Sequence, residues 1–76
     1  MEMNDFIAKF EDVFEDTDLS MLTPETCFRD LKEWTSMTAL ATMAMVSEEY
    51  EVELTPEDIR NACTFEDLFL ITKSHL

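Results

Sequence analysis

Few residues in this chain of 76 could carry chemistry. Ser36 stands at the head of the longest run of helix-forming residues, and the other candidates are Cys27, Cys63 and His75. Two cysteines and one histidine are too few for the usual four-ligand zinc site, so we expect no metal. A nucleophilic serine needs a neighbouring base, and the single histidine lies at the C-terminal end, so we expect no enzyme activity. We expect both thiols to be reduced, and the sequence leaves a disulfide between them open.

Ser36 itself has two possible uses. A serine at a helix start commonly caps the helix, because its hydroxyl accepts a hydrogen bond from a free backbone N–H group. Alternatively, a phosphate ester on the same hydroxyl would place negative charge at the positive end of the helix, where free N–H groups bind anions. Spacing alone favours the cap and leaves covalent modification open.

The helix that would position Ser36 lies within residues 33–55 and is predicted to begin at Ser36 and to end at about Tyr50. This run contains no glycine or proline, so nothing in it opposes a helix. Its apolar residues occupy most of the circumference and leave a polar seam of Thr38, Thr42 and Glu49. One apolar face should join the core, and it comprises Ala39, Met43, Val46 and Tyr50. Its expected neighbours are Phe6, Phe10, Phe14, Ile59 and Leu68. A second face should be partly exposed, and it comprises Met37, Leu40, Ala41, Ala44 and Glu48.

Three further helices are expected around this one. Apolar residues recur at spacings of three and four between residues 3 and 16, which predicts an amphipathic helix. Thr55 and Pro56 predict the start of a short helix, and Thr64 with Asp67 predicts a capping box at the start of the last helix. Residues 51–54 should be an extended link. Residues 17–34 should be a long connection packed on the core, in which residues 23–25 could open a single helical turn.

We therefore predict one all-α domain over residues 1–76. It should be a small bundle of three main helices plus a short helix before the last, with a long loop between helices one and two.

Composition limits the partners. The net charge is −13, from 18 acidic and 5 basic residues. Nucleic acid and anionic membrane surfaces would be repelled, so we expect protein partners with basic patches. We expect no signal peptide, and the sequence contains no apolar run of about 18 residues that would span a bilayer. We expect a cytoplasmic monomer.

Taken together, these features resemble the acyl carrier protein family over essentially the whole chain. The resemblance is carried by Ser36 followed by Met37, by the helix ending Ser47-Glu48-Glu49-Tyr50, by the extended Val52-Glu53-Leu54, and by the closing Thr64-Phe65-Glu66-Asp67-Leu68. It implies that a phosphopantetheinyl transferase attaches 4′-phosphopantetheine to Ser36. The thiol of that arm would then hold acyl groups as thioesters in fatty-acid, lipid or secondary-metabolite biosynthesis.

The resemblance also implies two sets of site residues. Partner enzymes, acyl-transferring or synthase enzymes with basic patches, would dock on Met37, Leu40, Ala41, Ala44, Glu48 and Glu49. The acyl chain would lie in a pocket of Met43, Val46, Leu54, Ile59, Ala62 and Leu68.

Three features depart from the family pattern. Thr35 stands where the family has aspartate, Trp34 and Glu33 replace a lead-in that contains glycine, and the first turns of the helix lack acids. A carrier for a specialised lipid or secondary-metabolite pathway is therefore as well supported as a fatty-acid carrier. The competing hypothesis is an acidic helical adaptor that binds a basic protein partner, carries no prosthetic group, and uses Ser36 only as a cap.

Overall fold

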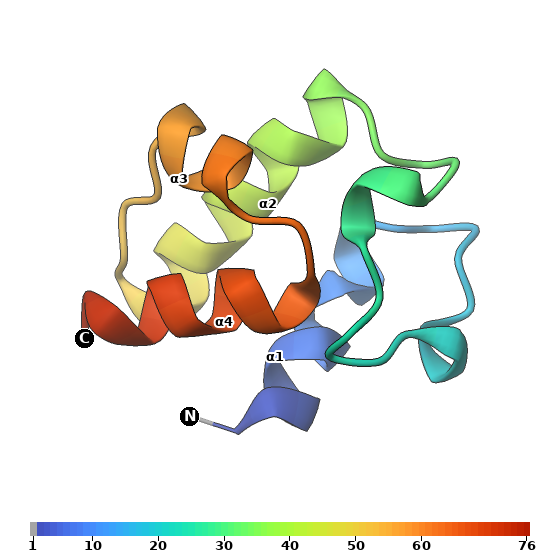
Figure 1. Cartoon of the computed structure of the whole chain (residues 1–76), viewed down its shortest axis with the longest axis horizontal. Coiled ribbons are helices and arrows are strands. Elements are labelled where there is room, and N and C mark those ends of the chain that lie inside the picture. Colours follow the sequence, from blue (N-terminus) through green and yellow to red (C-terminus); the bar gives the residue numbers. More distant parts are fainter. Residues whose placement is uncertain (1) are drawn as a thin grey trace.

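The computed structural model describes residues 2–76, which form a small all-α bundle (Figure 1). The α-helices are α1 (Met3–Ala8), α2 (Ser36–Tyr50), α3 (Pro56–Asn61) and α4 (Phe65–Ser74). Single 3₁₀ turns lie at η1 (Lys9–Asp12), η2 (Leu19–Met21) and η3 (Phe28–Asp30). Over this part of the chain there is no strand, and the long connection lies between α1 and α2. The predicted fold class is confirmed. None of the described helices is both long and apolar enough to span a membrane.

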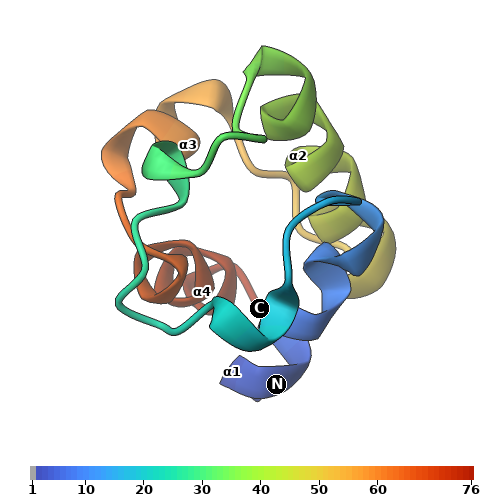
Figure 2. The ribbon, with the colours of Figure 1, turned by 90° about the vertical axis from the view of Figure 1, so that its right-hand side faces the viewer.

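The four α-helices surround one apolar core (Figure 2). Aromatic rings fill much of it: Phe10 packs edge-on against Phe65 at 5.0 Å between centroids, and Phe6 packs edge-on against Phe69 at 5.6 Å. Such edge-to-face pairs add to the free energy gained by burying the rings. The buried apolar side chains are Phe6, Ile7, Phe10, Val13, Phe14, Leu22, Phe28, Met45, Val46, Val52, Leu54, Ile59, Ala62, Phe65 and Leu68.

The first helix is shorter than predicted. The pattern indicated a helix over residues 3–16, whereas α1 ends at Ala8 and continues only as the 3₁₀ turn η1 to Asp12. Acidic residues gather where the negative end of the helix dipole lies, which disfavours further helix there. A 3₁₀ turn is a common way for a helix to end. The core face of the segment is nevertheless kept, since Phe6, Phe10 and Phe14 are all buried.

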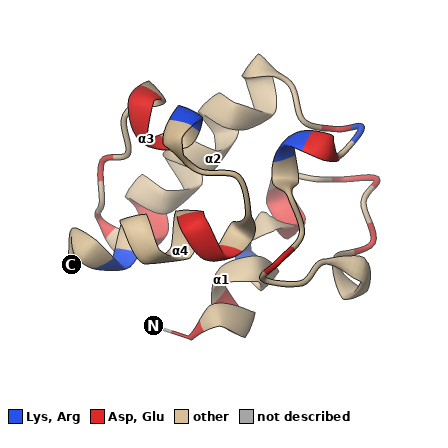
Figure 3. Ribbon diagram, viewed as in Figure 1, with Lys and Arg blue, Asp and Glu red and all other residues tan. Residues whose placement is uncertain are grey.

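The central helix α2 begins at Ser36 and is capped by the residue before it. The Thr35 hydroxyl accepts hydrogen bonds from the amides of Met37 and Thr38, and the Thr35 amide donates to the Thr38 hydroxyl at 2.7 Å. This reciprocal capping box satisfies N–H groups that have no partner within the helix. The helix ends at Glu51, whose left-handed φ of 56° stops it. Residues 36–47 carry no charge, so this part of α2 is tan in Figure 3.

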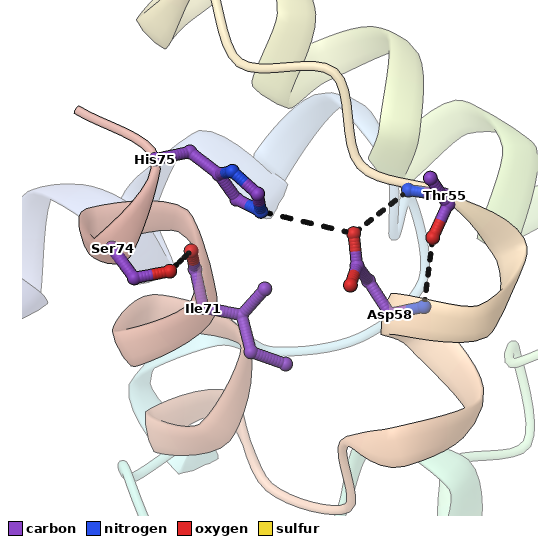
Figure 4. Close-up of polar contacts among 5 residues, drawn as sticks. All are labelled: Thr55, Asp58, Ile71, Ser74 and His75. Carbon is purple, nitrogen blue, oxygen red and sulfur yellow. Dashed lines mark hydrogen bonds and ion pairs between the residues drawn. The ribbon is translucent and has the colours of Figure 1, made fainter.

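Both predicted capping residues of the later helices are confirmed. Thr55 and Thr64 each accept from the amide three residues on, and Asp58 and Asp67 accept in return from the two threonine amides. Asp58 Oδ2 also lies 3.9 Å from His75 Nε2, and Figure 4 shows the two side chains facing each other. The C-terminal end of α4 therefore lies against the start of α3, where it bounds one side of the bundle.

The connection between α1 and α2 packs on the core, as its apolar residues predicted, because Leu22 and Phe28 are buried. The helical turn predicted at residues 23–25 is wrong: these residues form a hydrogen-bonded turn, and the 3₁₀ turns lie at η2 and η3 instead. Three backbone hydrogen bonds join residues 24–28 to residues 63–66 at the start of α4. The predicted link before α3 contains no helix or strand, and it buries two alternate side chains, Val52 and Leu54. Its first residue, Glu51, is left-handed and not extended as predicted.

Candidate functional site

Ser36 is the first residue of α2, and its side chain is exposed. Ser36 is not the N-cap residue of α2, because Thr35 occupies that position and accepts the capping hydrogen bonds. Within residues 2–76 the Ser36 hydroxyl makes no hydrogen bond to the protein. It lies instead at the positive end of a 15-residue helix that has no acid in its first turn.

An apolar cavity of about 470 Å³ opens beside Ser36. It lies between the N-terminal half of α2, the end of the connection and α3. Six of the ten lining residues are apolar, and the others carry two hydroxyls and two guanidinium groups. The lining residues are Arg29, Trp34, Thr35, Ser36, Ala39, Leu40, Met43, Pro56, Ile59 and Arg60.

Only part of the predicted acyl pocket lines this cavity. Met43 and Ile59 do, and Ser36 lines the same cavity. The other four predicted residues, Val46, Leu54, Ala62 and Leu68, are buried in the core and do not line the cavity. The prediction missed Trp34, Ala39 and Pro56 and the two arginines. An aromatic side chain two residues before the candidate serine was the one signal that could have indicated a cavity wall.

The core face of α2 differs from the predicted one. Val46 is fully buried, but its partners on the helix are Thr42 and Met45, while Ala39 and Met43 are only half-buried. The prediction that Thr42 belongs to a polar seam is wrong, because its exposed fraction is 0%. Its hydroxyl donates to the Thr38 carbonyl at 2.8 Å. This hydrogen bond satisfies the one polar group of the side chain, so Thr42 can be buried at little cost.

The expected contacts of this face are partly seen. The Tyr50 ring lies 5.9 Å from Phe6 between centroids. Burial raises the pKa of the Tyr50 hydroxyl above its usual value, and the nearby carboxylates of Asp5 and Glu49 raise it further. Tyr50 therefore stays neutral at physiological pH and serves as the half-buried end of the core face.

All six residues of the predicted docking set are exposed: Met37, Leu40, Ala41, Ala44, Glu48 and Glu49. Leu40 has an exposed fraction of 63% and Met37 one of 78%, which is unusual for such large apolar side chains. Within residues 2–76 this leaves an apolar strip along α2 with acids at its C-terminal end. Exposed apolar surface edged by polar residues is typical of interaction sites.

The docking set borders two different hollows. Leu40 lines the cavity beside Ser36, whereas Ala41, Ala44, Glu48 and Glu49 line a second hollow of about 660 Å³ between α2 and the α1–η1 segment. Six of the residues around this second hollow are acids: Glu2, Asp5, Glu11, Asp12, Glu48 and Glu49. Its cation is Lys9, whose Nζ lies 3.7 Å from Glu49. We call this hollow the acidic groove.

Arg29 holds the connection against α3 at the cavity wall. One Nη of its guanidinium group donates to the carbonyl of Ile59 at 2.5 Å, and the group lies 5.8 Å from the centroid of the Phe28 ring. The Phe28 ring in turn packs edge-on against Trp34 at 4.5 Å. A chain of contacts therefore links the carbonyl of Ile59 to the aromatic wall next to Ser36.

The two cysteines lie at the junction between the connection and α4. They are unbonded thiols, and their Sγ atoms are 2.9 Å apart across the bridge that pairs Cys27 with Thr64. The hydrogen bond between the two sulfurs raises the pKa of the Cys63 thiol. In residues 2–76 no cluster of histidine, cysteine and carboxylate side chains could hold a metal ion.

Comparison of the chain with protein-family models, with curated proteins and with solved structures found no match. The resemblance to acyl carrier proteins therefore rests on the ordered motifs in the sequence.

Proposed function

We propose that this protein is an acyl carrier protein that holds acyl groups as thioesters on a 4′-phosphopantetheine arm attached to Ser36. The observation that carries the proposal is the position of that serine. Its hydroxyl is exposed, has no capping role, and lies at the edge of an apolar cavity. The cavity supports the proposal because an acyl chain is apolar and gains free energy when it leaves water.

The residues around Ser36 fit the arm. A phosphodiester on the Ser36 oxygen would lie at the N-terminus of α2, where the helix dipole favours negative charge. Thr35 supplies the cap through a neutral hydroxyl, so attachment at Ser36 need not break the capping hydrogen bonds. When bound, the arm supplies the thiol that carries the acyl group.

The protein itself would supply shelter and recognition. Leu40, Met43 and Ile59 offer apolar surface for an acyl chain, and the flexible thioether of Met43 suits a cavity whose contents change. Met37, Leu40 and the acids of the acidic groove would dock on a phosphopantetheinyl transferase and on acyl-transferring or synthase enzymes with basic patches. In this proposal the protein is a carrier and not a catalyst, and its cytoplasmic location and monomeric state remain predictions.

The second candidate function is an acidic helical adaptor without a prosthetic group. The acidic groove favours it, because six acids around one hollow would attract a basic protein segment whether or not Ser36 is modified. The two proposals differ in whether Ser36 carries the 4′-phosphopantetheine arm.

Intact mass measurement separates them. The protein is expressed with phosphopantetheinyl transferases of different specificity, and the mass should increase by one arm, located on the peptide that contains Ser36. Ser36→Ala should stay unmodified, while the control Ser74→Ala, at the exposed end of α4, should be modified like the parent. A parent protein that stays unmodified with every transferase would reject the carrier function and favour the adaptor.

A further inference from the structure

The cavity beside Ser36 is unusual in its charge. The chain has only 5 basic residues, yet two of them, Arg29 and Arg60, line this cavity, and no acid does. The acidic groove shows the opposite pattern, with six acids and one lysine. In a protein whose net charge is −13, this hollow therefore combines an apolar lining with positive charge. The two cations come from separate elements, Arg29 from η3 and Arg60 from the last turn of α3.

Arginines at an apolar cavity select for a particular kind of ligand. Low-dielectric walls strengthen the field of the guanidinium groups inside the cavity. A guanidinium group has five N–H donors in a fork that matches a carboxylate. Arg29 uses one of its nitrogens on the carbonyl of Ile59, which fixes the side chain and leaves donors for a ligand. Arg60 is exposed, and none of its nitrogens is engaged by the described residues.

We propose that this cavity binds an acyl group that carries a carboxylate, with the chain against Trp34, Leu40 and Met43 and the carboxylate at Arg29 and Arg60. The ligand class is a medium-length aliphatic or aromatic chain that ends in a free carboxylate, bound in preference to a neutral molecule of the same length. As cargo it would come from a dicarboxylic acid, in which one carboxyl group forms the thioester with loss of water and the other stays free for the arginines. The identification of this ligand as the cargo rests on the proposed carrier function. Binding of a free acid to the cavity needs no arm on Ser36, so the two proposals can fail separately.

The test uses the unmodified chain of 76 residues and amide chemical shifts. Octanoate, the neutral octanol and the short anion acetate are titrated at pH 7. Octanoate should shift the amides around the cavity in a saturable way and bind about fivefold or more tightly than octanol, because one ion pair at a partly desolvated site is worth about 1 kcal/mol. Acetate should bind more weakly than octanoate because it lacks the chain. The affinity for octanoate should fall as salt rises from 0.05 to 0.5 M.

Charge variants identify the groups responsible. Arg60→Gln should weaken octanoate binding about fivefold and leave octanol binding unchanged, whereas the control Lys73→Gln, on α4 and outside the cavity lining, should leave both unchanged. Arg29→Lys keeps the charge and loses the fork, so it should retain part of the preference for octanoate. Because Arg60 makes no contact that holds the fold together, its variant decides the question even if Arg29 variants unfold.

Three results would overturn the proposal. The first is equal affinity for octanol and octanoate, and the second is unchanged octanoate binding by Arg60→Gln. The third is displacement of octanoate by inorganic phosphate at a similar concentration, which would assign the arginines to the phosphodiester of the arm. A protein that binds octanoate as expected but is never modified at Ser36 would keep the acid-binding cavity and lose the carrier function.

Discussion

Two apolar residues of α2 should respond very differently to truncation. Val46 has an exposed fraction of 0%, whereas Leu40 has one of 63% and lies on the predicted docking face. Val46→Ala removes two buried carbons, each of which contributes about 0.8 kcal/mol by leaving water. The cavity left in the core adds to this loss, so the free energy of unfolding should fall by about 2 kcal/mol or more. For a domain of this size that corresponds to a melting temperature lower by about 10 °C or more.

Leu40→Ala should cost far less. Most of its side chain is already in water, and substitutions at such positions usually change stability by less than about 0.5 kcal/mol. Its melting temperature should therefore stay within about 3 °C of the parent. If the docking face is used, the same variant should slow modification of Ser36 by the transferase, because the apolar contact with the enzyme is lost.

The assay pairs thermal unfolding by circular dichroism with the rate of arm transfer by mass spectrometry. Both are measured for the parent, for Leu40→Ala and for Val46→Ala below its melting transition. The expected outcome is a separation of effects: Val46→Ala loses stability and keeps the transfer rate, whereas Leu40→Ala does the reverse. A Leu40→Ala protein that melts as far below the parent as Val46→Ala would place Leu40 in the core and refute the assignment of the face.

Three further outcomes follow from charge and thiol chemistry. Replacing Glu48 and Glu49 by glutamine should slow association with the transferase, and this decrease in the association rate should become smaller as salt rises. Stopped-flow measurements at two ionic strengths test this. A decrease that does not depend on salt would argue against docking. Oxidation by a small disulfide such as oxidised glutathione should join Cys27 to Cys63 within one chain. The two cysteines are 36 positions apart, and closing a loop of that length should stabilise the fold by about 4 kcal/mol. The melting temperature should rise, and a reductant should reverse the rise, whereas a disulfide between two molecules would contradict the close approach of the sulfurs. Hydrogen bonds from the Cys63 and Thr64 amides lower the pKa of Asp67, so its contribution to stability is present at neutral pH and is lost as the pH falls through that lowered pKa. The melting temperature of Asp67→Asn should therefore lie below that of the parent at pH 7 and approach it in acid. A difference in melting temperature that stays constant with pH would refute this role.

Local signals in the sequence were sufficient for the ends of the later helices. Thr55 with Pro56 and Thr64 with Asp67 each form a cap within a few residues of chain, so their chemistry does not depend on the rest of the fold. The short first helix is a different case. Its apolar spacing continues to residue 14, and the change to a 3₁₀ turn after Ala8 leaves that spacing almost unchanged. Periodicity therefore identified the buried face and not the type of helix.

The core face of α2 could not be predicted from periodicity, because apolar residues surround this helix. The sequence offered no contrast between its sides, so the orientation depends on tertiary contacts. Thr42 illustrates the point: it reads as polar in the sequence, yet one hydrogen bond to the preceding turn makes it suitable for the core. The cavity could not be predicted for another reason, since its lining comes from segments far apart in the sequence: Trp34 from the connection, and Pro56 and Arg60 from α3.

Thr35 and Ser36 have separate roles: Thr35 caps α2, which leaves the hydroxyl of Ser36 free for attachment. An aspartate at position 35, as in the resembling family, would also cap α2, but it would place a negative charge next to the group attached to Ser36. Threonine provides the same capping hydrogen bonds without charge. The first turn of α2 has no acid, and the cavity beside it has two arginines and no acid. The surroundings of Ser36 are thus the part of this acidic protein best suited to negative charge, which is what a phosphodiester and a carboxylated acyl group would both bring.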